Sequence, residues 1–385
     1  MAGNYISVYM LGKDYPNTVI GVVLAVGNIV SLVLQAAISS FVDSRKNVSV
    51  FTVINILLVV LFIMAVGVLV IGVNCLALTV IYTGYISIHT TLQPFINSIP
   101  GKLIDGKYAI YYGPARAIGS LSGGTVCMLL GVIIARTSVD AIPAQALITI
   151  LIIEVFLIRL QKNYKKTLPD GYSVHRNKST QRDQSETAIS TIDFIKRNKL
   201  FIGICVGYVT VWFMTVIVEN YTLQIIKEIG GDVSQLGIVT LLLCICEMPA
   251  MIFFGWFRNK FKYGFLLKVG VTFNTIKMLV MTFAPNMLII YLSQPLQILG
   301  LGLIMPTMVY MVNDIMDERE AVRGQSIVTM GWAIGLVIGS VFGGIILDAM
   351  GVHSLMLITS AITIMGAVVM YIFANKLQNK VDMKG

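Results

Sequence analysis

Residues 48–72 read VSVFTVINILLVVLFIMAVGVLVIG, a stretch without a single charged side chain. A bilayer core of roughly 30 Å is crossed by about 20 apolar residues in an α-helix, so this stretch predicts a membrane span. Hydrophobic residues make up 56% of the chain and charged residues only 12%, which is typical of a protein whose solvent is mostly lipid. Stretches of the same kind predict eleven spans, at residues 18–42, 48–72, 75–99, 109–135, 142–158, 200–226, 236–257, 265–284, 287–312, 324–347 and 353–374.

The Lys and Arg residues behind the net charge of +9 are concentrated on one side of the expected membrane topology. If alternate loops are cytoplasmic, 22 of the 28 Lys and Arg residues lie on one side, ten of them within 159–199. This asymmetry predicts that the central loop and the C-terminus are cytoplasmic, in a multi-pass protein of the plasma or inner membrane. The asymmetry explains the excess of Lys and Arg without a nucleic-acid partner.

The polar stretch 159–199 divides the spans into two sets. We expect an N-terminal helical bundle at 1–158, a cytoplasmic central loop at 159–199 and a C-terminal helical bundle at 200–385, with a short amphipathic helix near 191–199. An offset of 216 residues supports this, because it places Asn4-Tyr5 on Asn220-Tyr221 and four glycines of the first half on glycines of the second. Two bundles related by a repeat are one known transporter plan.

The repeat also predicts an incomplete first helix. Residues 1–11 correspond to the end of the span at 200–226, and eleven residues are too few to cross a bilayer. We therefore expect a first helix truncated at its N-terminus, or a start upstream of Met1.

Four ionisable residues stand out inside the predicted spans, Arg116, Glu219, Glu247 and Lys277, whereas Glu154 and Lys268 lie nearer the span ends. A charge at the bilayer centre costs at least ~2.5–3.5 kcal/mol, so such residues need partners or a water-filled cavity. Burial favours the neutral carboxyl, whereas a nearby cation favours the carboxylate. A carboxyl balanced between these effects can exchange a proton, so we expect these four to form charge pairs for proton coupling. The alternative is a static ion pair that holds helices together.

Polar side chains form stripes along several spans, and a stripe of this kind is costly against lipid. We therefore expect them to face a solute cavity, although interhelical hydrogen bonding is the competing interpretation. The expected solute-binding residues are Tyr85, His89, Gln93, Asn97, Asn28, Gln35, Trp212, Gln294 and Gln297. Amides, hydroxyls and an aromatic plane suit a neutral sugar or nucleoside-like solute.

Small residues at a spacing of four predict close helix contacts at Gly119-Gly123, Gly203-Gly207 and Gly335-Gly339-Gly343. The five cysteines lie in apolar spans without metal-binding spacing, so no metal or cofactor is expected. The sequence contains no P-loop, nucleophile elbow or HExxH motif, so we expect no enzyme activity.

Three motifs carry a family resemblance: Tyr112 to Ser120 (YGPARAIGS), Gln93 to Asn97 (QPFIN) and Glu247-Met248-Pro249. With the order of spans, they make the whole chain resemble the major facilitator superfamily, and within it the oligosaccharide and nucleoside proton symporters related to lactose permease. The resemblance implies two six-helix bundles, an all-α polytopic fold and a monomeric secondary transporter. It also places Lys277 near Glu247, and Glu219 near an acidic position of the family.

The resemblance has limits that affect the expected substrate. The family's loop signature is reduced to Asp43, Arg45 and Lys46, the expected gating loop. Gly123, Gln93, Gln297 and Gly300 stand where lactose permease has its sugar-binding and coupling residues, so a galactoside preference is not implied. The leading hypothesis is proton-coupled uptake of a small polar solute by alternating access. The alternatives are a drug or metabolite exporter and a non-transporting membrane sensor or scaffold.

Overall fold

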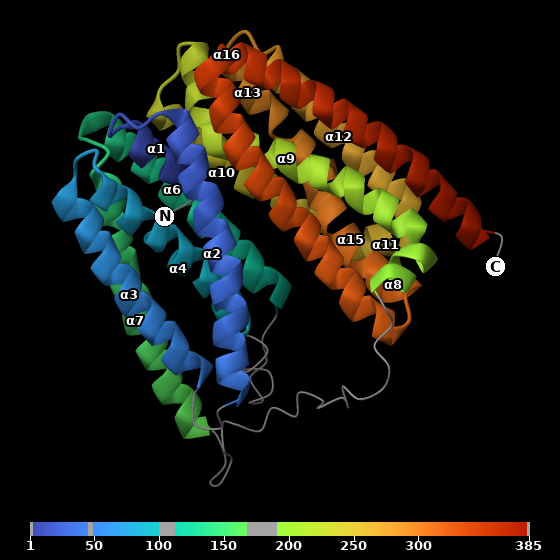
Figure 1. The fold of residues 1–385 in the computed structure, drawn as a ribbon, viewed down its shortest axis with the longest axis horizontal. Helices are drawn as coiled ribbons and strands as arrows, with labels where there is room; N and C mark the ends of the chain where they lie inside the picture. The colour runs from blue at the N-terminus through green and yellow to red at the C-terminus, as the bar shows by residue number, and fades with distance from the viewer. Residues whose placement is uncertain (1–2, 45–48, 100–111, 168–190, 383–385) are drawn as a thin grey trace.

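The computed structural model describes residues 3–44, 49–99, 112–167 and 191–382. All regular structure in this part of the chain is helical, in two bundles (Figure 1). The first bundle contains α1 (Gly3–Leu11), α2 (Asn17–Ser44), α3 (Val50–Ile71), α4 (Leu76–Asn97), α6 (Tyr112–Arg136) and α7 (Ala141–Thr167). The second contains α8 (Thr191–Arg197), α9 (Lys199–Glu228), α10 (Val233–Ile252), α11 (Phe254–Lys260), α12 (Tyr263–Thr282), α13 (Met287–Ser293), α14 (Leu296–Leu299), α15 (Leu301–Ile315) and α16 (Glu318–Asp382).

Each of the eleven expected spans has a helical counterpart, and the all-α prediction is confirmed. Nine helical stretches among the described residues are long and apolar enough to cross a membrane. The span expected at 75–99 is present as α4 but is not one of the nine, because its polar stripe lowers its hydropathy. The ninth stretch, Arg323–Leu377, covers the last two expected spans, and Gly351 divides it with a left-handed φ of 78° that favours glycine.

Two boundaries differ from the expectation. Helix α7 continues to Thr167, beyond the end predicted at residue 158, so part of the expected central loop is helical. The span expected at 287–312 is broken into α13, α14 and α15. Pro295 and Gly300 stand at the two breaks, and Gly300 has the non-helical angles φ −84° and ψ −114°. The predicted short helix after the central loop is present as α8.

Two buried tyrosines show the internal repeat in three dimensions. The Tyr5 hydroxyl of α1 donates to the Cys127 carbonyl of α6 at 2.8 Å. The Tyr221 hydroxyl of α9, 216 residues later, donates to the Ser340 carbonyl of α16 at 2.6 Å. The same pair of helices is therefore joined in the same way in both bundles. Helix α1 has only nine residues, about 14 Å at 1.5 Å per residue, which is too short to cross a bilayer.

The predicted small-residue contacts are confirmed in the second bundle and wrong at Gly119 and Gly123. A Cβ on Gly335 would lie 2.6 Å from the Trp212 Cβ, so glycine allows α16 and α9 to approach closely. Among the described residues, no atom would lie within 4 Å of a Cβ on Gly119 or Gly123. Helix α6 packs on α10 through Gly124 instead, where a Cβ would lie 3.1 Å from Leu241.

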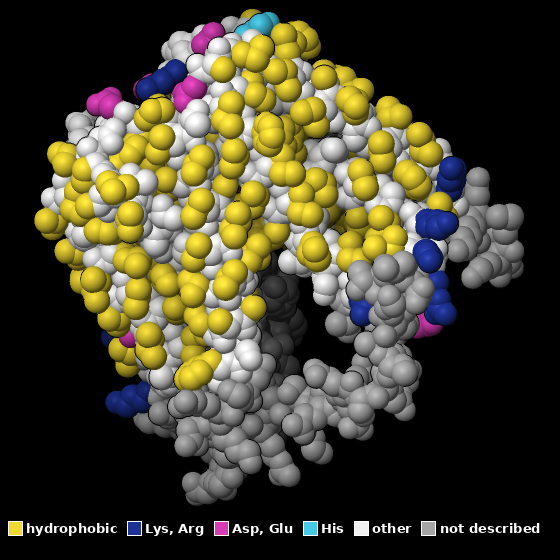
Figure 2. All heavy atoms as spheres, viewed as in Figure 1, with side chains coloured by type: hydrophobic (Ala, Val, Ile, Leu, Met, Phe, Trp, Pro, Cys, Tyr) yellow, Lys and Arg dark blue, Asp and Glu magenta, His cyan; other side chains and the backbone are white. Residues whose placement is uncertain are grey.

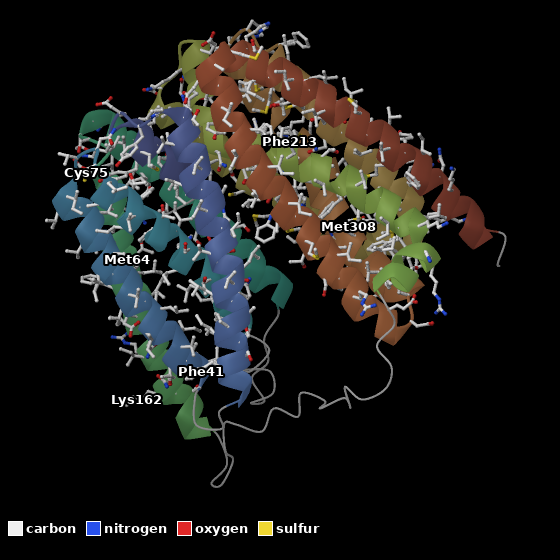
Figure 3. The ribbon with its side chains drawn as sticks, in the orientation of Figure 1. Phe41, Met64, Cys75, Lys162, Phe213 and Met308 are labelled. Carbon is white, nitrogen blue, oxygen red and sulfur yellow. The ribbon has the colours of Figure 1, made fainter. Side chains whose placement is uncertain are left out.

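The outer surface is predominantly apolar. Figure 2 shows hydrophobic side chains over most of both bundles, with most of the visible Lys and Arg at the right-hand end of the second bundle. Phe213 and Met308 lie within the second bundle, whereas Phe41 and Lys162 lie at the lower end of the first (Figure 3). Apolar side chains that face lipid gain nothing from burial, so they remain exposed on the outer surface. The apolar side chains inside each bundle pack against one another.

Candidate functional site

A buried lysine and a glutamate are joined through an amide in the second bundle. The Lys277 ammonium of α12 donates to the Gln297 Oε1 at 2.7 Å, and the Gln297 Nε2 donates to the Glu247 Oε1 at 2.8 Å. Lys277 is 2% exposed and Gln297 3% exposed. We call Lys277, Gln297 and Glu247 the relay. Gln297 is one of the predicted solute ligands, but in this conformation its amide links two charged groups.

The break in the α13–α15 helix positions the relay. Helix α14 carries Gln297 and ends at Gly300, where an added Cβ would lie 3.1 Å from the Leu296 carbonyl and 3.4 Å from the Asn274 backbone nitrogen. Glycine therefore lets α14 approach α12 one turn before Lys277. At the break between α13 and α14, the Gln294 Nε2 donates to the Ile290 carbonyl at 2.9 Å and to the Ser293 hydroxyl at 3.1 Å. These bonds stabilise the end of α13.

A second carboxylate shares the lysine of the relay. Glu219 of α9 is partly buried and interacts electrostatically with both Glu247 and Lys277. Two carboxylates and one ammonium carry a net charge of −1 when all three are ionised. The group becomes neutral when either carboxyl binds a proton.

The stripes of the first bundle link α2 to α4. The Gln35 Nε2 donates to the Thr90 carbonyl at 3.3 Å, and the Thr90 hydroxyl donates to the Asn28 Oδ1 at 3.5 Å. Farther along α4, Gln93 and Asn97 are exposed, as an accessible binding surface requires.

Tyr85 and His89 differ from the rest of their stripe. Their rings are stacked at a centroid distance of 6.1 Å, and Tyr85 is 1% exposed within the interior of the first bundle. The Tyr85 ring therefore has no surface left for a solute in this conformation, and its predicted binding role stays a prediction. Partly buried His89 lies at the end of this stack, toward the exposed amides.

Two tryptophans lie where the bundles meet. The Trp212 ring of α9 and the Trp332 ring of α16 form an edge-to-face pair at 6.0 Å. Trp332 also lines a narrow crevice with Asn28, Ser31 and Thr90 of the first bundle. Trp332 is not among the site residues predicted from the sequence. The internal repeat could have found it, because an offset of 216 places Trp332 on Arg116, one of the intramembrane charges.

The bundles converge at one end and separate toward the other. Figure 2 shows a hollow between their lower parts, and Figure 1 shows α2 and α16 adjacent at the top. At the upper end the Asp348 carboxylate of α16 accepts hydrogen bonds from the Thr18 N–H at 2.6 Å, the Asn17 N–H at 3.1 Å and the Asn17 side chain at 2.8 Å. Asp348 thus caps the N-terminus of a helix in the other bundle, where a carboxylate is favoured. We call this contact the α2–α16 latch.

Comparison with known proteins agrees with this geometry. The family model described as the MFS_1 like family matches residues 3–358. The chain belongs to this family of major facilitator transporters. No curated protein matches the transporter significantly in sequence.

Solved structures with a similar fold cover almost the whole chain. A point mutant of the nucleoside transporter NupG aligns with a TM-score of 0.77 at 14% identity, over 96% of this chain and 94% of the other. Unmutated NupG aligns with a TM-score of 0.69 at 14% identity, over 96% of each chain. A bacterial homologue of the human lysosomal transporter Spinster, in an inward-facing and unoccupied conformation, aligns with a TM-score of 0.63 at 14% identity, over 97% and 94%. At this identity the likeness shows the fold of the transporter and not its substrate.

Four predicted residues of the transporter cannot be placed in the site. The side chains of Arg116 and Asp43 and the whole of Arg45 and Lys46 lie outside the described part of the structure. The predicted roles of Arg116 as a second cation and of the other three as a gating loop stay predictions.

Loss of the latch should open the upper end of the transporter. Asp348→Ala removes a charged cap worth about 1–2 kcal/mol, so the ratio of open to closed molecules at this end should rise about 5- to 30-fold. Ser340 is fully buried, with its carbonyl against Gly21 of α2 and its hydroxyl bonded to Asn220 of α9, so a Ser340→Cys reporter should become more accessible when α2 moves away from α16. The labelling rate of this cysteine by a membrane-impermeant maleimide should rise by the same factor in Asp348→Ala.

Asp232→Ala is the matched control, because Asp232 caps its own helix, α10. The Ser234 hydroxyl and the backbone N–H groups of Gln235 and Ser234 hold the pKa of Asp232 below its usual value. Asp232→Ala should therefore weaken α10 without speeding the labelling of Ser340→Cys. Equal labelling in Asp348→Ala and its parent would show that the latch does not hold the bundles together.

Proposed function

We propose that the protein is a proton-coupled importer of a small, neutral, polar solute. The observation that carries this proposal is the pairing of Glu219 and Glu247 with a single lysine, because that set is neutral only with one bound proton. Within the relay, the Gln297 amide connects Lys277 to Glu247 by hydrogen bonds. The same amide can also donate to a solute.

The coupling cycle follows from charge balance. A proton bound to Glu219 or Glu247 makes the cluster neutral and allows the bundles to rock around the solute. Once the proton and the solute have both left on the cytoplasmic side, the empty carrier returns and binds its next proton outside, whereas a carrier with solute but no proton does not return. We take 1–158 and 200–385 as the two moving units and a monomer as the working unit. The solute gradient is thereby tied to the proton gradient.

The proposed solute class is nucleoside-like or sugar-like. Support comes from the amides of Asn28, Gln35, Gln93 and Asn97 and from the indole of Trp332 beside Asn28. Amides pair with hydroxyls and base edges, and an aromatic plane contacts a ring face. The nucleoside transport named for NupG makes nucleosides the first probes, although its 14% identity extends only to the fold.

The experiment is uptake into proteoliposomes under an inward proton gradient. Radiolabelled uridine, adenosine and sucrose serve as probes, with empty liposomes as the blank. A gradient of one pH unit supplies about 1.36 kcal/mol per proton, enough for about tenfold accumulation at one proton per solute. Accumulation of at least one probe supports import. Proton-driven loss of a preloaded probe would instead support an exporter, and movement of none of them would contradict the proposed solute class.

We also propose that the central segment and the C-terminus face the cytoplasm. Ser138 lies between α6 and α7, at the end opposite to the central segment, and is exposed. In intact cells an impermeant maleimide should label Ser138→Cys, whereas Ser179→Cys should need permeabilisation. The reverse pattern would invert the proposed topology.

A further inference from the structure

An apolar groove runs along the outer face of the second bundle, between α10, α11 and α14. Its volume is about 410 Å³, and it is lined by Pro249, Ala250, Phe253, Trp256, Phe257 and Ile298. Phe253 and Trp256 are 60% and 55% exposed, so the groove is open along the surface. A groove without a polar lining on the lipid-facing surface suits a hydrocarbon chain and not a hydrated solute.

A basic rim adjoins one end of this groove. The Lys260 ammonium lies 4.9 Å from the centroid of the Trp256 ring, which forms a wall of the groove. Lys260 also lines a second cavity of about 440 Å³ together with Arg258, Lys262 and Asp314. That cavity has three cationic side chains and one carboxylate, so it favours an anion.

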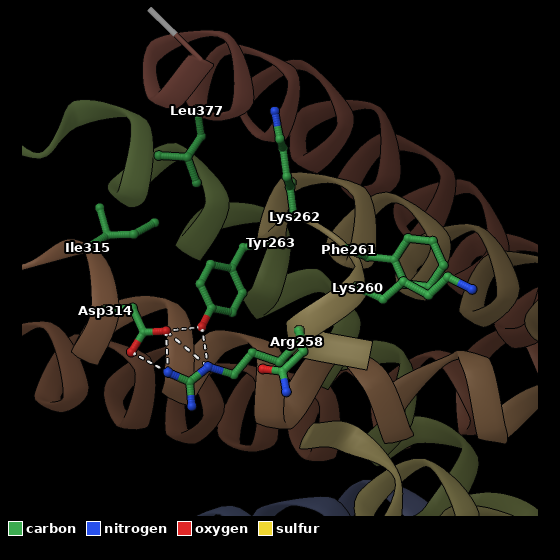
Figure 4. Close-up of a pocket in the computed structure, with 10 residues that line it drawn as sticks. Arg258, Lys260, Phe261, Lys262, Tyr263, Asp314, Ile315 and Leu377 are labelled. Carbon is green, nitrogen blue, oxygen red and sulfur yellow. Dashed lines mark hydrogen bonds and ion pairs between the residues drawn. The ribbon is translucent and has the colours of Figure 1, made fainter. Parts of the chain in front are cut away.

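The single carboxylate of the rim is already occupied. Arg258 pairs with Asp314 at 2.7 Å, and the Tyr263 hydroxyl also donates to that carboxylate. Figure 4 shows Arg258 and Tyr263 pointing toward Asp314, whereas Lys260 and Lys262 point away from it. Among the described residues, no carboxylate lies within ion-pair distance of Lys260. The Lys260 ammonium lies over the Trp256 and Phe261 rings and can therefore also meet an external anion.

We infer that the groove and its rim form a binding site for an anionic phospholipid. One acyl chain lies along Pro249, Phe253 and Ile298, and the phosphate lies at Lys260 and Lys262. A basic pocket next to an apolar groove at the end of membrane helices is the pattern that acidic headgroups recognise. A free phosphate would use the rim but leave the groove unfilled, so the lipid accounts for both features.

The groove lies next to the residues of the relay in the chain. Pro249 follows Glu247 by two positions on α10, and Ile298 follows Gln297 directly on α14. Helices α10 and α15 approach closely here, since a Cβ on Gly302 would lie 2.9 Å from the Ala250 Cβ. A chain in the groove therefore packs against the outer faces of the two helices whose inner faces hold Glu247 and Gln297.

Trp256 makes the site measurable, because the chain has only three tryptophans. The variant Trp212→Phe/Trp332→Phe retains Trp256 as the sole fluorophore. It is reconstituted in phosphatidylcholine vesicles that contain increasing fractions of dibrominated phosphatidylglycerol or dibrominated phosphatidylcholine, and bromine quenching is followed. Half-maximal quenching should need at least about fivefold less of the acidic lipid, the preference that one of the two rim lysines alone would give. If this variant does not fold, the difference between the wild type and Trp256→Phe isolates the same signal.

Lys260→Gln/Lys262→Gln should remove the preference and leave quenching equal for both lipids. Lys376→Gln is the matched control, because Lys376 also lies over an aromatic ring, Phe373, outside the rim. It should keep the fivefold preference. Equal quenching by both lipids in the parent, or a preference that survives the double lysine change, would overturn the inference. Loss of the preference when potassium phosphate replaces potassium chloride at equal ionic strength would assign the rim to free phosphate and overturn it as well.

Discussion

Glu247→Gln should abolish accumulation of the solute against a gradient and leave exchange across the membrane intact. In the wild type the Gln297 Nε2 lies 2.8 Å from the Glu247 Oε1. Glutamine at position 247 keeps the shape of the side chain and can still accept this hydrogen bond. It cannot titrate, and the remaining Glu219 and Lys277 balance each other without a proton. In proteoliposomes with a gradient of one pH unit, the ratio of internal to external solute should fall from about 10 to about 1.

Glu154→Gln is the control for this change. Glu154 is a partly buried carboxyl of α7 in the other bundle, and it is no part of the relay. Its replacement should leave accumulation near the wild-type level. If Glu247→Gln and Glu219→Gln both accumulate solute as the wild type does, these carboxyls do not couple transport to protons. The polar stripes would then belong to a uniporter.

Lys277→Met should destabilise the protein more than the double change Lys277→Met/Glu247→Gln. Removal of the ammonium leaves two carboxylates inside the bundle without a described cation beside them. Loss of one partner of a buried charge pair costs about 3–5 kcal/mol. The double variant also neutralises Glu247, so it leaves one carboxylate, Glu219, without a cation where the single variant leaves two. The measurement is the midpoint of thermal unfolding in detergent, where the single variant should melt well below the double variant.

Lys268→Met serves as the matched control on the same helix. The Lys268 ammonium donates to the Asn375 Oδ1 at 2.8 Å in an exposed position, so its loss leaves no charge buried. Its midpoint should stay close to that of the wild type. A double variant that melts as low as Lys277→Met would show that Lys277 contributes packing and not charge compensation.

Much of the architecture is predictable from sequence because lipid imposes strict rules. Every backbone polar group must be paired within the membrane, so apolar stretches of sufficient length become helices. The Tyr5 and Tyr221 contacts follow from the repeat, since equivalent residues in the two halves meet equivalent helices. The proximity of Lys277, Glu247 and Glu219 follows from the cost of isolated charge and from the family resemblance.

Other features depend on local backbone geometry that periodicity does not reveal. The break at Gly300 turns Gln297 toward Lys277 and Glu247, and an unbroken helix would place that amide elsewhere. Gly119 and Gly123 match the small-residue pattern but contact none of the described residues, because α6 uses Gly124 to meet α10. Tyr85 follows the polar spacing of its stripe, yet its apolar ring packs in the bundle interior. Spacing identifies a helix face but not the neighbour of that face.

The most direct test of the central proposal is whether the solute carries protons with it. Wild-type proteoliposomes are prepared without any pH gradient in weakly buffered medium, and the transported probe is added outside while the external pH is recorded. Co-transport predicts immediate external alkalinisation that a protonophore abolishes and that Glu247→Gln lacks. Solute entry at the wild-type rate with no change in external pH would contradict proton coupling by Glu219, Glu247 and Lys277.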